Sequence, residues 1–153
     1  MSPSMRSERR LEEDLLQSLT QTPSVSKARI WAGRSLSGLA VLFLTLDGVI
    51  KFAKPVPVVE AFAKLGWPIG LAETIGSILL VCVVLYAIPR TAILGAVLLT
   101  GYLGGAVATH LRVGDPVFSH VLFPTYMGAV IWIGLYLRDS RLRGFIGSRP
   151  GTD

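Results

Sequence analysis

The amino-acid sequence predicts an all-α membrane protein, an antiparallel bundle of four transmembrane helices. Hydrophobic residues make up 51% of the 153-residue chain and charged residues only 16%, whereas soluble domains carry about a quarter charged residues. The charged residues are also concentrated toward the two ends of the chain, which leaves long apolar segments between them. No basic stripe interleaved with aromatic residues is present, so binding to nucleic acid is not expected.

Four apolar segments have the length of a membrane span, for which roughly 20 mostly apolar residues are needed. These segments are residues 30–52, 69–88, 91–111 and 118–137. The second and third spans are joined by two residues, Pro89-Arg90, and the third and fourth by the short turn 112–116, so each pair is expected to form an antiparallel hairpin. The membrane domain is thus placed at 28–138, between polar tails at 1–27 and 139–153. The first tail is compatible with a short amphipathic surface helix or with disorder.

The loop after the first span is expected to carry a short helix at the membrane surface. Pro55 and Pro57 end the first span, and residues 58–65 have one apolar face. Gly66 stands where a glycine commonly terminates a helix. Trp67 follows it, and tryptophan is enriched at the level of the lipid headgroups. The fold prediction therefore includes one interfacial helix in the first extracytoplasmic loop.

The distribution of basic residues predicts that both termini lie in the cytoplasm. The terminal tails and the turn between spans two and three carry ten of them: Arg6, Arg9, Arg10, Lys27, Arg29, Arg90, Arg138, Arg141, Arg143 and Arg149. The opposite side carries four: Lys51, Lys54, Lys64 and Arg112. Cytoplasmic loops are the ones that accumulate Lys and Arg.

Ionisable side chains inside the spans are the candidate functional residues, because each costs about 2.5–3.5 kcal/mol at the bilayer centre. The predicted helix directions place four of them in the outer third of the bilayer, one on each helix: Asp47, Glu73, His110 and His120. Two carboxylates and two imidazoles at one depth can relay protons, hold a quinone headgroup or ligate a metal. A structural interpretation stays open, since Lys51 follows Asp47 at the spacing favoured for helical ion pairs. Glu73 is the strongest candidate because no basic residue lies one turn away on its own helix.

The third span is rich in small residues: Gly95, Gly101, Gly104, Gly105, Ala106 and Ala108. Gly101 and Gly105 form a GxxxG motif, and Gly104 with Ala108 repeats the small-xxx-small spacing. We expect these residues to pack the third helix closely inside the bundle. Association of two copies through the Gly101, Gly104 and Gly105 face is the alternative.

Two segments resemble the DoxX-like family of bacterial integral membrane proteins: TGYLGGAVATHLRVGDP at 100–116 and FSHVLFP at 118–124. Lys51-Phe52, residues 58–66, Glu73 and the turn 89–91 also resemble it, and the similarity covers about residues 30–143. The resemblance implies a four-helix bundle in the bacterial inner membrane. It also implies a link to a membrane thiosulfate:quinone oxidoreductase, after which the family is named. Further positions that match the family pattern support the cluster: Tyr102, Arg112 and Asp115.

Two functions are consistent with these features. The first is an accessory or anchor subunit of a membrane redox system, which would use a bound quinone or a partner subunit's cofactor. It agrees with the single cysteine, Cys82, which rules out an internal dithiol, and with the lack of a complete cofactor motif. The second is an acid–base enzyme for a lipophilic substrate, with Glu73 or Asp47 as the base and a histidine as the acid. A haem or metal carrier using His110 and His120 is a third hypothesis.

Overall fold

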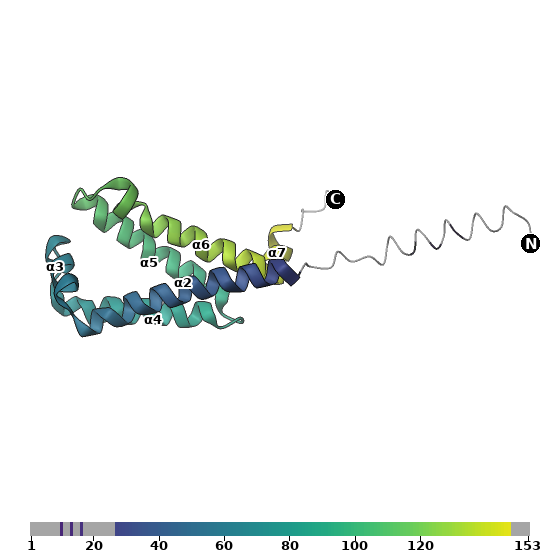
Figure 1. Ribbon diagram of the computed structural model, residues 1–153, viewed down its shortest axis with the longest axis horizontal. Coiled ribbons are helices and arrows are strands. Elements are labelled where there is room, and N and C mark those ends of the chain that lie inside the picture. The colour runs from purple at the N-terminus through teal and green to yellow at the C-terminus, as the bar shows by residue number, and fades with distance from the viewer. Residues whose placement is uncertain (1–9, 11–12, 14–15, 17–26, 148–153) are drawn as a thin grey trace, which may run out of the picture.

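Four long helices form the body of the protein, and the computed structural model describes residues 10, 13, 16 and 27–147 (Figure 1). The elements are α2 (Lys27–Ala53), α3 (Val56–Lys64), the 3-10 turn η1 (Ile69–Leu71), α4 (Ala72–Ala87), α5 (Ala92–Arg112), the π-helical turn η2 (Val117–Val121), α6 (Phe123–Arg138) and α7 (Ser140–Gly147). Within these described residues, four helical stretches are long and apolar enough to cross a membrane: 27–53, 69–87, 92–112 and 117–138. The predicted four-span fold is confirmed, and the predicted helix ends lie within three residues of the observed ones.

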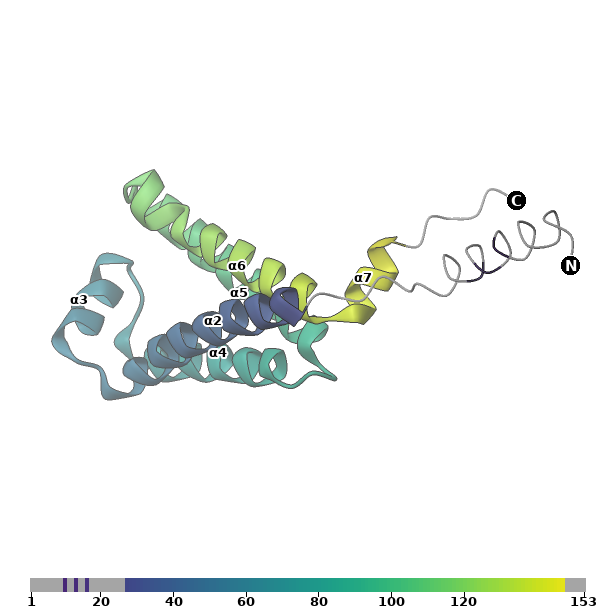
Figure 2. The ribbon, with the colours of Figure 1, turned by 45° about the vertical axis from the view of Figure 1, so that its right-hand side comes forward.

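The four spans pack as a square in which α2 and α5 lie on opposite corners. Helix α2 packs against α4 and α6, and α5 packs against the same two helices. The two pairs α2/α4 and α5/α6 lie close together near α7 and separate toward α3 (Figure 2). The largest fully buried side chains hold the closed part of the bundle: Leu79, Tyr86, Leu99, Ile131 and Leu135.

Glycines make the tightest helix contacts, and in α5 the close contact is made by Gly95 rather than by the residues of the GxxxG motif. A Cβ atom on Gly95 would lie 2.2 Å from the backbone nitrogen of Tyr86, so this glycine fixes the close approach of α5 to α4. A Cβ atom on Gly101, Gly104 or Gly105 would meet no atom within 4 Å. The prediction that small residues pack α5 closely is thus confirmed at Gly95 and wrong at these three glycines, because no other helix comes within that distance of them.

Helix α3 forms as predicted and begins two residues earlier, at Val56. Pro57 stands in its first turn, where a missing N–H costs nothing. Gly66 ends the helix with a φ of 70°, a left-handed conformation that glycine adopts without strain. Its buried side chain is Phe62. The helix lies across the end where the two helix pairs separate (Figure 1).

The segment after α6, predicted as a polar tail, contains the ordered helix α7. The carboxylate of Asp139 accepts a hydrogen bond of 2.8 Å from the backbone N–H of Arg141 and so caps the start of α7. Leu142 is buried in the core of the bundle. The surface helix considered for the N-terminal tail lies outside the described residues, apart from positions 10, 13 and 16.

Candidate functional site

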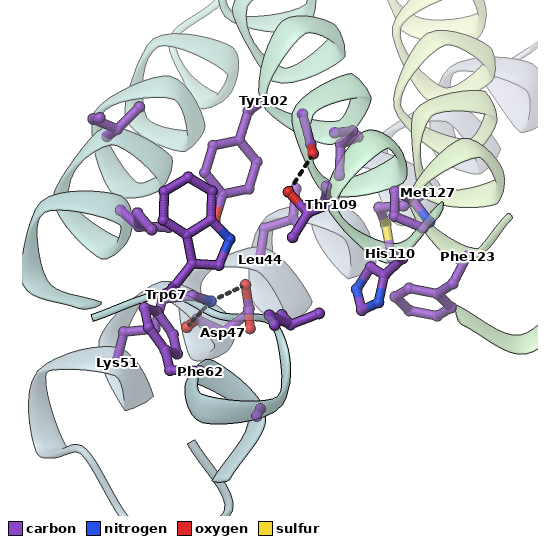
Figure 3. Close-up of a pocket in the computed structure, with 18 of the residues that line it drawn as sticks. Leu44, Asp47, Lys51, Phe62, Trp67, Tyr102, Thr109, His110, Phe123 and Met127 are labelled. Carbon is purple, nitrogen blue, oxygen red and sulfur yellow. Dashed lines mark hydrogen bonds and ion pairs between the residues drawn. The ribbon is translucent and has the colours of Figure 1, made fainter. Parts of the chain in front are cut away.

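A cavity of about 580 Å³ lies at the α3 end of the bundle, between the two separated helix pairs (Figure 3). Its volume is within the range of small-molecule sites, about 300–1,000 Å³. The walls are mostly apolar, with large side chains from α2, α3, α6 and the loop after α3, among them Phe43, Phe62, Trp67, Phe123 and Met127. Polar side chains that line it come from α2 and α5: Asp47, Lys51, Tyr102, Thr109 and His110.

Glycine residues on α5, which carry no side chain, create part of this space. Gly101 and Gly105 line the cavity, and the room in front of each is open to at least 4 Å from an added Cβ. Gly104 has the same freedom but does not line the cavity. The glycines at positions 101 and 105 thus leave part of the cavity open, an effect that the GxxxG spacing does not distinguish from helix packing.

Asp47 and Lys51 form the ion pair that their spacing predicts. The Lys51 Nζ atom lies 2.6 Å from Oδ2 of Asp47, and it also donates to the backbone oxygen of Asp47 at 3.0 Å. The lysine side chain is only 12% exposed, whereas the carboxylate is 42% exposed. The pair therefore presents mainly its acceptor, the carboxylate, to the cavity (Figure 3).

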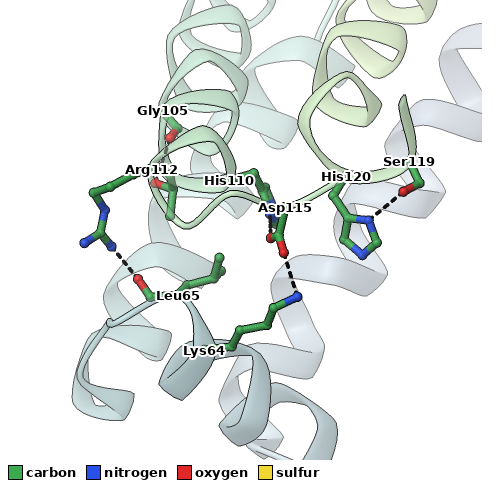
Figure 4. A network of polar contacts seen from close by, with 9 residues as sticks. Lys64, Leu65, Gly105, His110, Arg112, Asp115, Ser119 and His120 are labelled. Atoms are coloured by element: carbon green, nitrogen blue, oxygen red, sulfur yellow. Dashed lines mark hydrogen bonds and ion pairs between the residues drawn. The ribbon is translucent and has the colours of Figure 1, made fainter. Parts of the chain in front are cut away.

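His110, in the last turn of α5, lines the cavity, and its imidazole ring is bound by Asp115 on the side away from the cavity. Its Nδ1 atom lies 2.7 Å from Oδ2 of Asp115, whose side chain is only 3% exposed. The other carboxylate oxygen, Oδ1, lies 2.6 Å from Nζ of Lys64 at the end of α3 (Figure 4). Hydrogen bonds from Lys64 and then from His110 lower the pKa of Asp115 below its usual value. One buried carboxylate thus fixes both a cavity histidine and the end of α3.

A second contact fastens α3 over the cavity. The guanidinium of Arg112 donates to the backbone oxygen of Leu65 (Figure 4). Arg112 and Asp115, both named from the sequence as supporting residues, therefore act on α3 rather than line the cavity themselves.

Glu73 lies apart from the cavity. Its side chain is 55% exposed and forms a 2.6 Å ion pair with Lys54 of the loop between α2 and α3. No basic residue lies one turn away from Glu73 on its own helix, but Lys54 reaches it from another part of the chain. The four predicted site residues therefore do not all converge, and Asp47 and His110 are the two that line the cavity.

His120 lies beside His110 but outside the cavity wall. The two imidazole rings meet edge to face, with their centroids 6.0 Å apart. His120 is exposed, and its Nδ1 atom lies 2.8 Å from Oγ of Ser119 (Figure 4). Within the described residues, no three His, Cys, Asp or Glu side chains gather in a way that would hold a metal ion.

Comparison with known proteins gives one result. The sequence model of the DoxX-like family matches residues 35–134, which are 100 of the 153 residues. The match runs from α2 into α6 and includes every residue that lines the cavity. No curated protein and no solved structure matches the chain.

Proposed function

Given that the chain belongs to the DoxX-like family, we propose that it binds a lipophilic molecule with a small polar head in the cavity under α3. The observation that carries this proposal is the composition of the cavity wall. Large apolar side chains surround a few polar groups, an arrangement typical of sites that bury a ligand and fix its orientation. The cavity also lies in a membrane-spanning bundle, so compounds dissolved in the lipid can reach it directly.

A quinone-class molecule meets these requirements. Aromatic and aliphatic side chains such as Phe43, Phe123 and Met127 would contact its ring and the start of its tail. Tyr102 and His110 would form hydrogen bonds to the two oxygen atoms of its head. They stand two turns apart on α5, about 12 Å along the axis at 1.5 Å per residue, so they would approach the ligand from different levels.

In the role that we propose, the protein is an accessory or anchor subunit of a quinone-linked redox system in the bacterial inner membrane, with both termini in the cytoplasm. The positive-inside distribution of basic residues supports this orientation. Cys82 is the single cysteine and is buried, so electrons would be carried by a bound quinone, which accepts them on reduction to hydroquinone, or by a partner subunit's cofactor.

An acid–base enzyme for a lipophilic substrate is the second candidate, and the contact between His110 and Asp115 favours it. A carboxylate at Nδ1 fixes the ring orientation and leaves Nε2 for proton exchange with a bound molecule. Asp47 would be the base in preference to Glu73, since Asp47 lines the cavity.

The binding test uses the fluorescence of Trp67, which lines the cavity. Trp31→Phe and Trp132→Phe leave Trp67 as the single tryptophan, since the chain has three. The purified protein in nanodiscs is titrated with decylbenzoquinone and with decylhydroquinone. We expect saturable quenching with one site per chain, and copurification of redox subunits with the unaltered protein from native membranes.

A matched pair of variants localises the binding. Gly105→Leu places a side chain in the cavity, and Gly104→Leu places the same side chain on the same helix outside it. We expect the first variant to weaken binding and the second to leave it unchanged. Equal effects of the two variants, or quenching that never saturates, would contradict the proposal.

A further inference from the structure

We propose that the cavity selects a neutral head group that donates hydrogen bonds, so that a lipophilic hydroxyl compound is bound in preference to its carbonyl counterpart. This inference rests on the proposed function, because it assumes that the cavity binds a ligand. It deepens that function by naming the chemical form of the ligand.

The fixed charges at the cavity are balanced in pairs. Asp47 is paired with Lys51 and Asp115 with Lys64, each at 2.6 Å. An ionised head group would enter a mostly apolar cavity without a free counter-charge, and an unpaired buried charge is strongly unfavourable. A neutral head group avoids this cost.

Two of the side-chain donors that line the cavity are occupied within the described residues. Lys51 donates to two oxygen atoms of Asp47 and is 12% exposed. The hydroxyl of Thr109 donates to the backbone oxygen of Gly105 at 2.8 Å. The indole N–H of Trp67 and the hydroxyl of Tyr102 remain as donors, and both groups are neutral. A ligand carbonyl, which can only accept, would therefore form only uncharged hydrogen bonds with them.

Acceptors remain available. Within the described part of the chain, Oδ1 of Asp47 and Nε2 of His110 have no hydrogen-bond partner. When Nδ1 of His110 donates to Asp115, Nε2 of the neutral ring carries a lone pair and accepts. The hydroxyl of Tyr102, which can donate or accept, is also unpaired there. A ligand hydroxyl can use these acceptors as well as the free donors, and only its bond to Asp47 would be charge-assisted, which favours the hydroxyl form.

The experiment compares three ligands that share one tail: decylhydroquinone, decylbenzoquinone and the dimethyl ether of decylhydroquinone. Affinities are measured by Trp67 quenching without oxygen at pH 8. A hydrogen bond to a charged group predicts that the hydroquinone binds tighter than the other two by about tenfold or more. Equal binding of all three, or tighter binding of the quinone, would overturn the inference and leave the proposed function standing. If none of the three binds, the proposed function fails with it.

Asp47→Asn tests the residue on which the preference depends. The amide replaces an acceptor by a donor and releases Lys51, so the hydroquinone-to-quinone affinity ratio is expected to fall toward one. Glu73→Gln, which removes a carboxylate outside the cavity, is expected to leave the ratio unchanged. An unchanged ratio in Asp47→Asn overturns the assignment. The three-ligand comparison on the unaltered chain decides the preference even where Asp47→Asn does not accumulate.

Discussion

Nζ of Lys64 lies 2.6 Å from Oδ1 of Asp115, and this ion pair joins the end of α3 to the turn after α5. The same carboxylate binds His110 through its other oxygen at 2.7 Å. The position of α3 and the orientation of a cavity histidine are therefore set by one side chain. Phe62 is the buried side chain of α3, so the helix relies on few contacts besides this pair and the bond from Arg112 to Leu65.

Asp115→Asn is expected to loosen α3 over the cavity, because it removes the charge that holds Lys64. The measurement is hydrogen–deuterium exchange of the amides in residues 56–64, which should become several-fold faster. Glu60→Gln is the control, since Glu60 is an exposed carboxylate on α3 with no ion pair within the described residues. The same exchange rates in both variants would contradict the role given to Asp115.

The contact of α3 should also depend on pH. A carboxyl group whose pKa is lowered by folding contributes its full stabilisation above the unfolded value of about 4 and loses it as the pH falls through the folded value. We therefore expect a constant signal from neutral pH down to about 5 and a loss of the contact below about 4. The emission of Trp67 as the single tryptophan should shift to the red in that range. Asp115→Asn should show no such step, and a step that persists in this variant would assign it to another group.

The sequence predicts those features that depend on neighbouring residues. The spans follow from the length of the apolar segments, α3 from prolines at one end and Gly66 at the other, and the pair of Asp47 and Lys51 from its four-residue spacing. Each of these patterns acts within one helix or at its ends. It can therefore be recognised without knowing which side of the helix faces the other helices.

Contacts between elements could not be predicted in the same way. The ion pairs of Glu73 with Lys54 and of Asp115 with Lys64 form only because the chain folds back over the open end of the bundle. Equal depth in the membrane put Glu73 in the predicted cluster, but depth does not say which way a side chain faces around its helix. The sequence likewise does not show that the helix pairs separate. Because they do, Gly101 and Gly105 line the cavity although their spacing is that of a packing motif.

Tyr86→Phe should destabilise the closed part of the bundle. The buried Tyr86 hydroxyl lies 2.9 Å from Oγ of Ser37 on α2 and donates to the backbone oxygen of Ile131 on α6 at 2.9 Å. Phenylalanine removes both hydrogen bonds, at a cost of about 1–2 kcal/mol in the free energy of unfolding. The measurement is reversible unfolding in mixed micelles with increasing SDS. Tyr136→Phe, at a half-exposed position, should change the free energy of unfolding much less, and equal losses would refute the network.

Gly104 offers a test of self-association that leaves the cavity intact. The predicted homo-oligomer would use the Gly101, Gly104 and Gly105 face, and of these three glycines only Gly104 does not line the cavity. Gly104→Leu should therefore convert an oligomer into a monomer in native mass spectrometry, since the larger side chain keeps two helices apart. If the unaltered protein is already a monomer in the same measurement, the predicted homo-oligomer is contradicted.

Gly95→Ala should cost more stability than any other glycine-to-alanine change in α5. The added Cβ would lie 2.2 Å from the nitrogen and 2.5 Å from the Cα of Tyr86, and these backbone atoms cannot rotate aside. The α4–α5 hairpin would have to open, which we expect to lower the free energy of unfolding by about 1–3 kcal/mol or more. Gly104→Ala adds the same methyl group where nothing lies within 4 Å, so its effect should stay within about 0.5 kcal/mol or be slightly stabilising through helix propensity. The SDS unfolding measurement compares the two variants directly. Similar free energies for both would mean that α4 and α5 do not approach each other as closely as Gly95 requires.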